Sequence, residues 1–365
     1  MSSLTICRPS AATLSRHASP RQPSSSRDGI SQQACSASSA SSLNGANGRV
    51  TIRAPLSRSV GYRVADVSGC RSERATRAAA SSSSSSSPAF SVADVSAPLS
   101  LTYLEGNSWL WSVDGVKVLV DPIIEGPLDF GIPWLYCGYK KVLKSLKLDD
   151  VIDADLVLIT QSLDDHMHAR TLKALAARRP DVPIIATPNG QAFLDSLFSN
   201  VTYLEPGSST SFSSSKGTRL TVKALPGPVL GPPWQRPENG YIVRGAASGA
   251  SIYIEPHCVF DEAALKEGGE RVDVLVTPVV KQELPGYTLV SGQEDAVRLA
   301  KVVGARYVAP MANADVNASG ILSALVTPNG TLDSFKAILQ SEVTGVGDNV
   351  EVLSIIPGQP IKVTL

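Results

Sequence analysis

The segment TQSLDDHMH at 160–168 carries the densest set of reactive side chains in the sequence, with two aspartates and two histidines in five consecutive positions. It follows the apolar run DADLVLI at 153–159, so these donors stand at the end of a predicted buried strand. Imidazole nitrogens and carboxylate oxygens are ligands that zinc, iron and manganese accept. Three of the four histidines lie here or at His257. The sequence therefore predicts a metal site, or the remains of one, between these two segments.

The first ninety residues differ in composition from the rest of the chain. They hold eleven Arg, no Lys, three acidic residues and 25 Ser, including seven consecutive serines at 81–87. Eleven basic against three acidic residues gives +8, and the neutral whole chain leaves −8 for 91–365. Such an N-terminus is typical of an organelle transit peptide. We expect a plastid transit peptide and a Ser-rich disordered linker over 1–90, and location in the chloroplast stroma. A disordered regulatory tail is the alternative.

Composition also limits the classes of partner that we expect this protein to bind. The sequence has no apolar run of about 18 or more residues, so we expect no membrane span. Cys137 and Cys258 lie outside the transit region and form no CxxC pair, which argues against a disulfide framework or a cysteine zinc site. Cys258 is expected to be a small buried side chain rather than a soft ligand or a nucleophile. A mild acidic balance without a basic patch predicts no nucleic-acid or anionic-lipid partner.

Residues 98–365 have the pattern of one large α/β domain. Apolar or alternating runs bounded by turn residues predict strands, and Asp114-Gly115 predicts a tight hairpin. The strands are expected at 99–105, 108–113, 116–122, 154–160, 182–188, 200–206, 219–226, 240–245, 251–256, 272–278, 305–310 and 349–355. Helical periodicity is found at 140–147, 169–179, 190–199, 262–269, 293–304 and 332–343. Hairpins come first and alternation with helices later, which predicts sheets inside and helices outside.

The order of several short signatures resembles that of one enzyme superfamily. LTYLEGNSWLWSVDGVKVLVDP, LVLITQSLDDHMHARTL, PENGYIV, SIYIEPHC and GQEDAVRLAKVVGARYVAPM follow one another as in the metallo-β-lactamase superfamily. The similarity is greatest to the branch that includes the ascorbate-6-phosphate lactonase-like proteins, and it covers about 98–315. It implies an αββα sandwich, with two sheets face to face, helices outside and the site at one edge.

The resemblance implies that the first metal position of this family is lost. The H-x-H-x-D-H motif of the family falls on 161–166, where Gln161 and Leu163 replace its first two histidines. Leucine offers no donor, and an amide oxygen is a weak zinc ligand. The third histidine would fall in LPGPVLGPP at 225–233, which contains no histidine. We therefore expect no two-metal centre and no hydrolysis of β-lactams.

The second metal position is partly retained in the same alignment. Asp165 and His166 match the motif, and His257 takes the place of the bridging aspartate. These three are the expected ligands of at most one divalent ion of zinc, iron or manganese, with Glu255 or Asp315 as a weaker fourth ligand. Asp165 is also the one candidate for a catalytic group. In the metal-free alternative, Asp165 and His166 only hold the loop together.

Neighbouring residues have simpler expected roles. Asp164 is expected to cap the following helix, because aspartate favours helix starts. His168 is expected at the surface or as a cap at the same helix start. Asp121, in the Asp-Pro pair, is expected to accept hydrogen bonds beneath the site. The terminal histidine of the family aligns with Ala312.

Two loops are candidates for ligand binding. The proline-rich segment 225–241 carries Trp234 and Arg236, which could hold a planar or anionic ligand. In the alternative, the segment is a lid and Trp234 is its core anchor. The loop 123–140 carries four aromatic residues and predicts an aromatic wall. Gln161 and Asn313 are weaker candidates for contact with a ligand.

Two classes of function are compatible with this sequence. In the first, the protein is a plastid metallo-β-lactamase-fold protein with a degenerate site, a non-classical or inactive hydrolase homologue that binds a small molecule or a partner. In the second, it is a single-metal hydrolase of an ester, lactone or phosphoester, in which the metal acidifies a bound water. The oligomeric state is not predicted.

Overall fold

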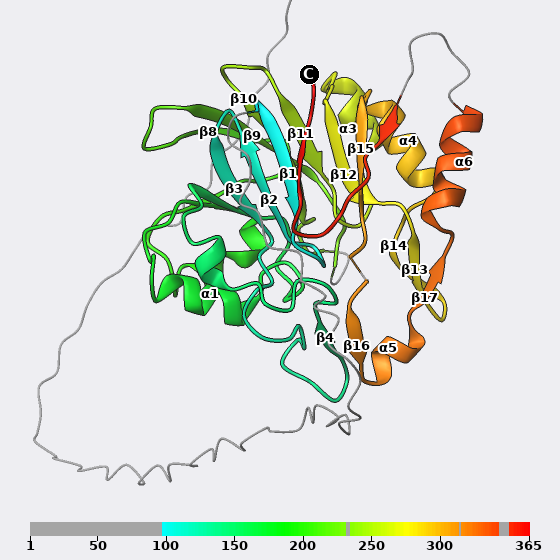
Figure 1. The fold of residues 1–365 in the computed structure, drawn as a ribbon, viewed down its shortest axis with the longest axis horizontal. Coiled ribbons are helices and arrows are strands. Elements are labelled where there is room, and N and C mark those ends of the chain that lie inside the picture. The colour runs from blue at the N-terminus through cyan, green and yellow to red at the C-terminus, as the bar shows by residue number, and fades with distance from the viewer. Residues whose placement is uncertain (1–96, 231–233, 314, 343–349) are drawn as a thin grey trace, which may run out of the picture. The chain divides into compact units, whose positions relative to one another are not determined.

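The computed structural model describes residues 97–230, 234–313, 315–342 and 350–365 (Figure 1). All of them belong to the compact unit Val67–Leu365. The transit peptide and linker expected over 1–90 lie outside the described residues, and that division of the chain stays a prediction. Among the described residues, no helix has the length and apolar character needed to cross a membrane.

Two seven-stranded sheets form the centre of the domain. The first runs in the order β19-β1-β2-β3-β5-β6-β7 and the second in the order β18-β15-β12-β11-β10-β9-β8. The strands of the first sheet are β1 (Leu99–Tyr103), β2 (Trp109–Val113), β3 (Val116–Val120), β5 (Leu156–Ile159), β6 (Ile184–Ala186), β7 (Val201–Tyr203) and β19 (Pro360–Lys362). Those of the second are β8 (Ser209–Ser213), β9 (Arg219–Pro226), β10 (Asn239–Gly245), β11 (Ser251–Ile254), β12 (Val274–Pro278), β15 (Tyr307–Met311) and β18 (Glu351–Val352).

The two sheets have the same arrangement of antiparallel and parallel strands. Each begins with antiparallel hairpins, β1-β2-β3 in one and β8-β9-β10-β11 in the other. Each continues with parallel strands, from β3 to β7 and from β11 to β18. Parallel neighbours need crossover connections, and the helices supply most of them. The carboxyl ends of the parallel strands therefore carry long loops in both sheets.

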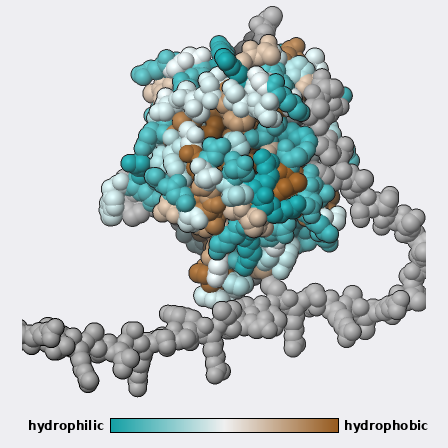
Figure 2. All heavy atoms as spheres, turned by 90° about the vertical axis from the view of Figure 1, so that its left-hand side faces the viewer, coloured by the Kyte–Doolittle hydropathy of each residue, from teal (hydrophilic) through white to brown (hydrophobic). Residues whose placement is uncertain are grey.

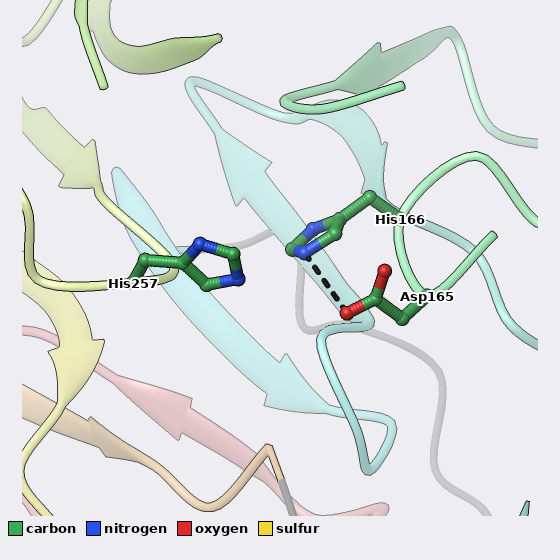
Figure 3. Close-up of side chains that lie close together, drawn as sticks. All are labelled: Asp165, His166 and His257. Atoms are coloured by element: carbon green, nitrogen blue, oxygen red, sulfur yellow. Dashed lines mark ion pairs between the residues drawn. The ribbon is translucent and has the colours of Figure 1, made fainter. Parts of the chain in front are cut away.

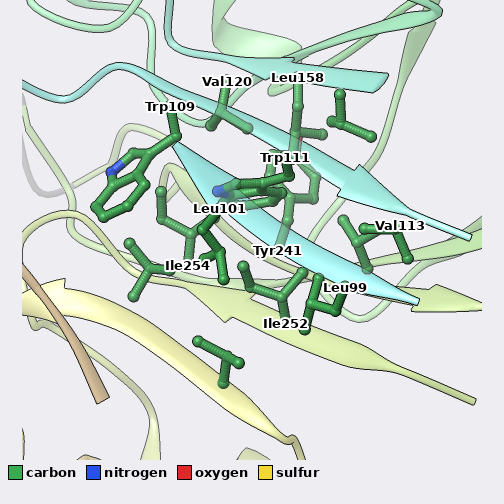
Figure 4. Packing of buried hydrophobic residues seen from close by; sticks show 14 of the residues in the cluster. Leu99, Leu101, Trp109, Trp111, Val113, Val120, Leu158, Tyr241, Ile252 and Ile254 are labelled. Atoms are coloured by element: carbon green, nitrogen blue, oxygen red, sulfur yellow. The ribbon is translucent and has the colours of Figure 1, made fainter. Parts of the chain in front are cut away.

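The main core lies between the inner faces of the sheets. Leu101, Trp111 and Leu158 of the first sheet pack there with Tyr241 and Ile252 of the second (Figure 4). All five are at most 1% exposed. Removing this apolar area from water is the main favourable contribution to the stability of the domain.

Helices cover the outer faces (Figure 1). On the first sheet these are η1 (Leu148–Asp150), α1 (Ala169–Ala176), η2 (Pro188–Gly190) and α2 (Gln191–Leu194), and buried side chains of α1 and α2 join the core on that face. On the second sheet they are α3 (Glu262–Glu267), α4 (Glu294–Val302) and α6 (Leu332–Glu342), with a third core beneath them. The α/β class and the αββα sandwich expected from the sequence are confirmed.

Two small sheets and a short helix lie beside the sandwich. One sheet joins β13 (Lys281–Leu284), β14 (Tyr287–Val290) and β17 (Thr327–Asn329). The other joins β4 (Cys137–Tyr139) to β16 (Asn317–Ser319), and α5 (Ile321–Leu325) follows directly. Figure 1 shows β4, β16 and α5 together at the lower end of the molecule.

The helix expected at 140–147 is wrong. Its backbone N–H groups at Lys141, Val142 and Leu143 donate instead to the buried carboxylate of Glu105, at distances of 2.7–3.2 Å. A carboxylate that accepts these bonds removes the N–H groups that a helix would use. The helix expected at 190–199 is also shorter, since the α-helix covers Gln191–Leu194 alone.

Candidate metal centre

The candidate centre is built by two loops that follow parallel strands. The loop after β5 supplies Asp165 and His166, and the turn after β11 supplies His257. Because β5 and β11 belong to different sheets, the three side chains meet at one edge of the sandwich. One donor atom from each residue lies within 4.8 Å of the others.

Figure 3 shows the two imidazoles facing each other, with Asp165 beside His166. The ring centroids are 5.5 Å apart and the rings are inclined at 76°. Asp165 Oδ2 lies 3.4 Å from His166 Nε2. Asp165 Oδ1 and His257 Nδ1 are buried and have no hydrogen-bond partner in the described part of the chain. These two atoms are therefore free to bind an ion or a ligand.

Asp121 fixes the orientation of His166 from below. Its Oδ2 lies 2.8 Å from His166 Nδ1, and its two oxygens accept from Thr160 N at 2.8 Å and Thr160 Oγ1 at 2.5 Å. Both Asp121 and His166 are fully buried. Burial is the largest effect on the carboxyl of Asp121 and raises its pKa. The role expected for Asp121, an acceptor beneath the site, agrees with this geometry.

Asn107, which sequence reasoning missed, holds the other side of the same ring. Its Nδ2 donates to the backbone carbonyl of Asp165 at 2.9 Å and lies 3.0 Å from His166 Nε2. That nitrogen can accept from the amide only when it carries no proton. Asn107 follows Gly106 in the turn between β1 and β2, and the GNS triplet there was the only signal in the sequence.

The two histidines have opposite electrostatic surroundings. Burial disfavours a charged His166, but the carboxylates of Asp165 and Asp121 outweigh it and raise its pKa to about 10. Burial lowers the pKa of His257 to about 4, and the neighbouring His166 adds to this effect. For Asp165, burial is outweighed by His166, and the pKa of the carboxyl is lowered. His257 is therefore a neutral nitrogen donor at pH 7, whereas His166 without an ion is protonated at pH 7 and must release a proton before it can bind one.

Glu255 lies next to the centre but outside the three-residue cluster. Its Oε2 accepts from His257 N at 3.1 Å and Val259 N at 2.7 Å, whereas its Oε1 has no partner among the described residues. Burial raises the pKa of Glu255 to about 8. Because Glu255 accepts from the backbone of the turn that carries His257 and is not one of the three clustered residues, the structure favours a role for it in shaping that turn.

The first metal position of the fold contains no nitrogen donor. Gln161 is fully buried, and neither atom of its amide has a partner in the described structure. Leu163 is 42% exposed and points no donor toward the centre. Ser162 Oγ donates to Glu238 Oε1 at 2.5 Å, and Glu238 Oε2 remains unpartnered among the described residues. The segment aligned with this position thus offers the amide of Gln161 and no imidazole.

A cavity of about 1680 Å³ opens beside the centre. Asp165 and His257 line it, together with Asn313 and Asp315. Asn313 accepts from Gln282 Nε2 at 2.6 Å, and Asp315 forms an ion pair with Lys141. Asp315 therefore pairs with Lys141 and is not one of the three clustered candidate ligands. Aromatic residues of the loop 123–140 (Phe130, Tyr136 and Tyr139) form part of the cavity wall.

The structure does not bring Trp234 or Arg236 to the cavity wall. Trp234 is 85% exposed, so the alternative in which it anchors a lid in the core is wrong. Arg236 pairs with Glu205 at 2.7 Å, and its backbone carbonyl accepts from Asn189. Residues 231–233 of the same loop lie outside the described residues. Of this loop, Leu230 lines the cavity.

The other residues singled out in the sequence are Asp164, His168 and Cys258, and the structure agrees with their expected roles to different extents. Asp164 Oδ1 accepts from Ala169 N at 2.9 Å at the start of α1, as expected for a cap. His168 is the N-cap residue of α1, one of its two expected places, although its side chain makes no capping bond. It is not at the surface: it is fully buried, with Nδ1 2.8 Å from Thr171 Oγ1 and Nε2 3.2 Å from the carbonyl of Pro127. Cys258 is buried, and burial raises the pKa of its thiol, which disfavours a nucleophilic role.

Comparison with solved structures finds the same fold in hydrolases. One is a metallo hydrolase from the archaeon Ignicoccus hospitalis, with 18% identity and a TM-score of 0.50 over 73% of this chain and 99% of that chain. Another is an isothiocyanate hydrolase from Delia radicum gut bacteria, with 16% identity and a TM-score of 0.50 over 72% and 98%. At such identities the likeness is one of fold. No curated protein matches the sequence.

A protein-family model agrees with the fold and with the order of the motifs. Residues 100–312 match the model described as a β-lactamase superfamily domain. This segment runs from β1 to the residue after β15, and it includes Asp165, His166 and His257. Because the match covers more than half of the chain, the protein belongs to the β-lactamase superfamily.

Proposed function

We propose that this protein is a non-classical member of its family, which binds a small molecule in the 1680 Å³ cavity beside a centre for one divalent metal ion. The observation that carries the proposal is the convergence of Asp165, His166 and His257, whose donor atoms lie within 4.8 Å of one another. The ascorbate-6-phosphate lactonase-like branch and the chloroplast stroma belong to the same proposal. They rest on the order of the motifs and on the composition of 1–90.

The three residues fit a single metal ion. Two nitrogens and one carboxylate oxygen are a donor set that zinc, iron and manganese accept. Unpaired buried polar atoms are uncommon in proteins, and two of the three clustered residues, Asp165 and His257, each carry one among the described residues. Asp121 supports His166 as outer carboxylates support metal-binding histidines in general.

The described residues contain no comparable cluster for a second ion. Where the family carries histidines, this chain has the amide of Gln161 and the apolar side chain of Leu163. Asp315 is paired with Lys141, and the carboxyl of Glu255 has a raised pKa because it is buried. A centre with at most one ion follows from these residues.

Hydrolysis of an ester, lactone or phosphoester is the second candidate function. A bound divalent ion would supply a Lewis acid that lowers the pKa of water. Asp165 lines the cavity and has an unpartnered oxygen among the described residues, so it is the candidate base. The lowered pKa of its carboxyl makes it a weak base at pH 7. This favours binding over efficient catalysis.

The test is metal content in two matched variants. The full chain would be purified without chelator and without a histidine tag, and its metals measured by mass spectrometry. Asp165→Asn removes the charged ligand and should reduce bound metal at least about tenfold. Asp164→Asn makes the same chemical change one residue away. Because asparagine caps helices as aspartate does, this control should keep its metal.

Hydrolytic screening of ester, lactone and phosphoester substrates on the same samples separates the two candidates. Activity lost together with metal in Asp165→Asn supports the hydrolase. Metal without activity supports the binding protein. Two tightly bound ions per chain, or unchanged metal in Asp165→Asn, would refute the centre proposed here.

A further inference from the structure

Exposed hydrophobic residues occur in the loop before β4, in β4 and in α5. Figure 1 shows β4, β16 and α5 together at the lower end of the molecule. We call this surface the apolar rim. It consists of Phe130 (39% exposed), Ile132 (40%), Trp134 (69%), Tyr139 (46%), Ile321 (58%) and Leu325 (45%). On the face shown in Figure 2, by contrast, hydrophobic side chains are scattered among hydrophilic ones. Scattered apolar residues are ordinary on a protein surface, whereas a gathered set marks an interaction site.

Backbone pairing holds the two parts of the rim together. Strand β4 pairs with β16 from Cys137↔Ser319 to Tyr139↔Asn317. Leu322 N of α5 donates to Leu135 O at 2.9 Å. The loop and the helix are therefore one fixed surface, although 174 positions separate Lys141 from Asp315, which also pair across it.

Lysines follow the rim residue Tyr139 directly in the sequence. The segment 139–147 contains Lys140, Lys141, Lys144 and Lys147 and no acidic residue. Lys141, Lys144 and Lys147 are exposed. Residues 91–365 have a net charge of −8, so this local cluster of lysines is not evident from the composition. For this reason the sequence analysis expected no contact with anionic lipid. A hydrophobic surface bordered by lysines matches the interface between acyl chains and anionic headgroups.

Two residues of the rim, Phe130 and Tyr139, also line the cavity, as do the neighbouring Leu322 and Lys140. Burial lowers the pKa of Lys140 to about 8. A molecule that enters past these residues passes from the rim toward Asp165 and His257, which line the same cavity.

We propose that the apolar rim binds the surface of an anionic lipid bilayer, with Trp134 inserted at the headgroup level. Tryptophan and tyrosine favour this depth because one end of the ring is apolar and the other is polar. Lysine stems can lie along apolar surface while the ammonium groups reach lipid phosphates. The cavity would then receive its small molecule from the bilayer. The proposal goes beyond the function proposed above and does not depend on metal at Asp165.

Tryptophan fluorescence gives a direct test, because Trp109 and Trp111 are fully buried and Trp134 and Trp234 are the exposed pair. The full chain would be mixed with vesicles of pure phosphatidylcholine, or with phosphatidylcholine vesicles that contain about 30% of the anionic lipid phosphatidylglycerol. We expect a blue shift of emission and co-sedimentation with the anionic vesicles. Trp134→Ala should abolish the shift and weaken partitioning about tenfold. Trp234→Ala, a matched loss of an exposed tryptophan on another loop, should leave both unchanged.

Charge is tested with a second matched set. Lys144→Glu/Lys147→Glu should weaken partitioning into anionic vesicles at least about tenfold. Lys173→Glu/Lys216→Glu changes the net charge by the same amount, at exposed lysines on α1 and on the β8–β9 turn. This control should have a much smaller effect. The arginines of 1–90 contribute equally to both double variants, so the comparison cancels their binding.

Three outcomes would overturn the proposal. The first is equal partitioning of wild type and Trp134→Ala. The second is an equal loss in the two lysine double variants. The third is a blue shift that appears without vesicles and grows with protein concentration while the molecular mass doubles, because a second copy of the chain would then cover the rim. Metal content should remain that of the wild type in every variant, which separates this test from that of the metal centre.

Discussion

At the scale of single residues, the alignment of a short motif identified the central side chains. Asp165, His166 and His257 are adjacent in space although 91 positions separate the two histidines. The motif could predict this because each residue follows a strand whose place in the fold is recognisable. Asn107 could not be found in the same way. Its role depends on a contact with a backbone carbonyl, which no residue pattern encodes.

The surroundings of His257 predict how stability depends on pH. The folded protein leaves this histidine unprotonated until the pH falls to about 4, whereas the unfolded chain protonates it near 6.5. Between these values the unfolded state binds more protons, so the free energy of unfolding decreases as the pH falls from 6.5 to 4. In His257→Gln this contribution is absent. Urea unfolding in the presence of a chelator should show wild type losing stability relative to the variant over this range. Parallel curves would contradict the prediction.

At the scale of elements, strong hydrophobic periodicity was predictive and short polar strands were not. All twelve expected strand segments overlap an observed strand. Strand β8 has the sequence STSFS, with four polar residues in five, and it forms because it pairs with β9 along its full length. Strands β4 and β16 have three residues each and pair over a long sequence distance. Such pairing is decided by the rest of the fold.

The hairpin between β2 and β3 gives a prediction at this scale. Asp114 has a positive φ of 51°, and its Oδ2 accepts from Ala247 N at 2.9 Å and Ser248 N at 3.3 Å in the β10–β11 turn. One carboxylate thus ties a hairpin of the first sheet to a hairpin of the second. Asp114→Ala loses both bonds and places alanine in a strained conformation, which should cost about 1–3 kcal/mol.

Asp114→Asn should cost much less, because asparagine tolerates positive φ and keeps an acceptor oxygen. Asp181→Ala, at an exposed position, should have almost no effect on stability. The measurement is the midpoint of urea unfolding for the three variants. Equal midpoints for Asp114→Ala and Asp181→Ala would show that this tie between the sheets does not contribute.

At the scale of the whole molecule, composition predicts where the protein works. The basic, serine-rich segment 1–90 and the acidic remainder lead us to expect that 1–90, fused to a reporter, enters plastids. The mature protein should begin near residues 70–80, as N-terminal sequencing of protein recovered from plastids would show. A fusion that stays in the cytosol would count against it. The order of motifs predicted the sandwich at this scale, since each motif sits on a strand of known place.

The C-terminal strand has a consequence for how this domain acquires its structure. Strand β19 covers the open edge of β1, with Ser100 opposite Lys362, 262 positions later in the chain. Pairing between strands so far apart in the sequence forms slowly, because the intervening chain must close before the contact can form. Until it forms, β1 presents unpaired N–H and C=O groups that can template aggregation. During synthesis, β1 emerges from the ribosome long before β19. The edge of β1 is therefore unprotected until β19 has emerged and paired with it. We expect a chaperone to be most useful during this interval.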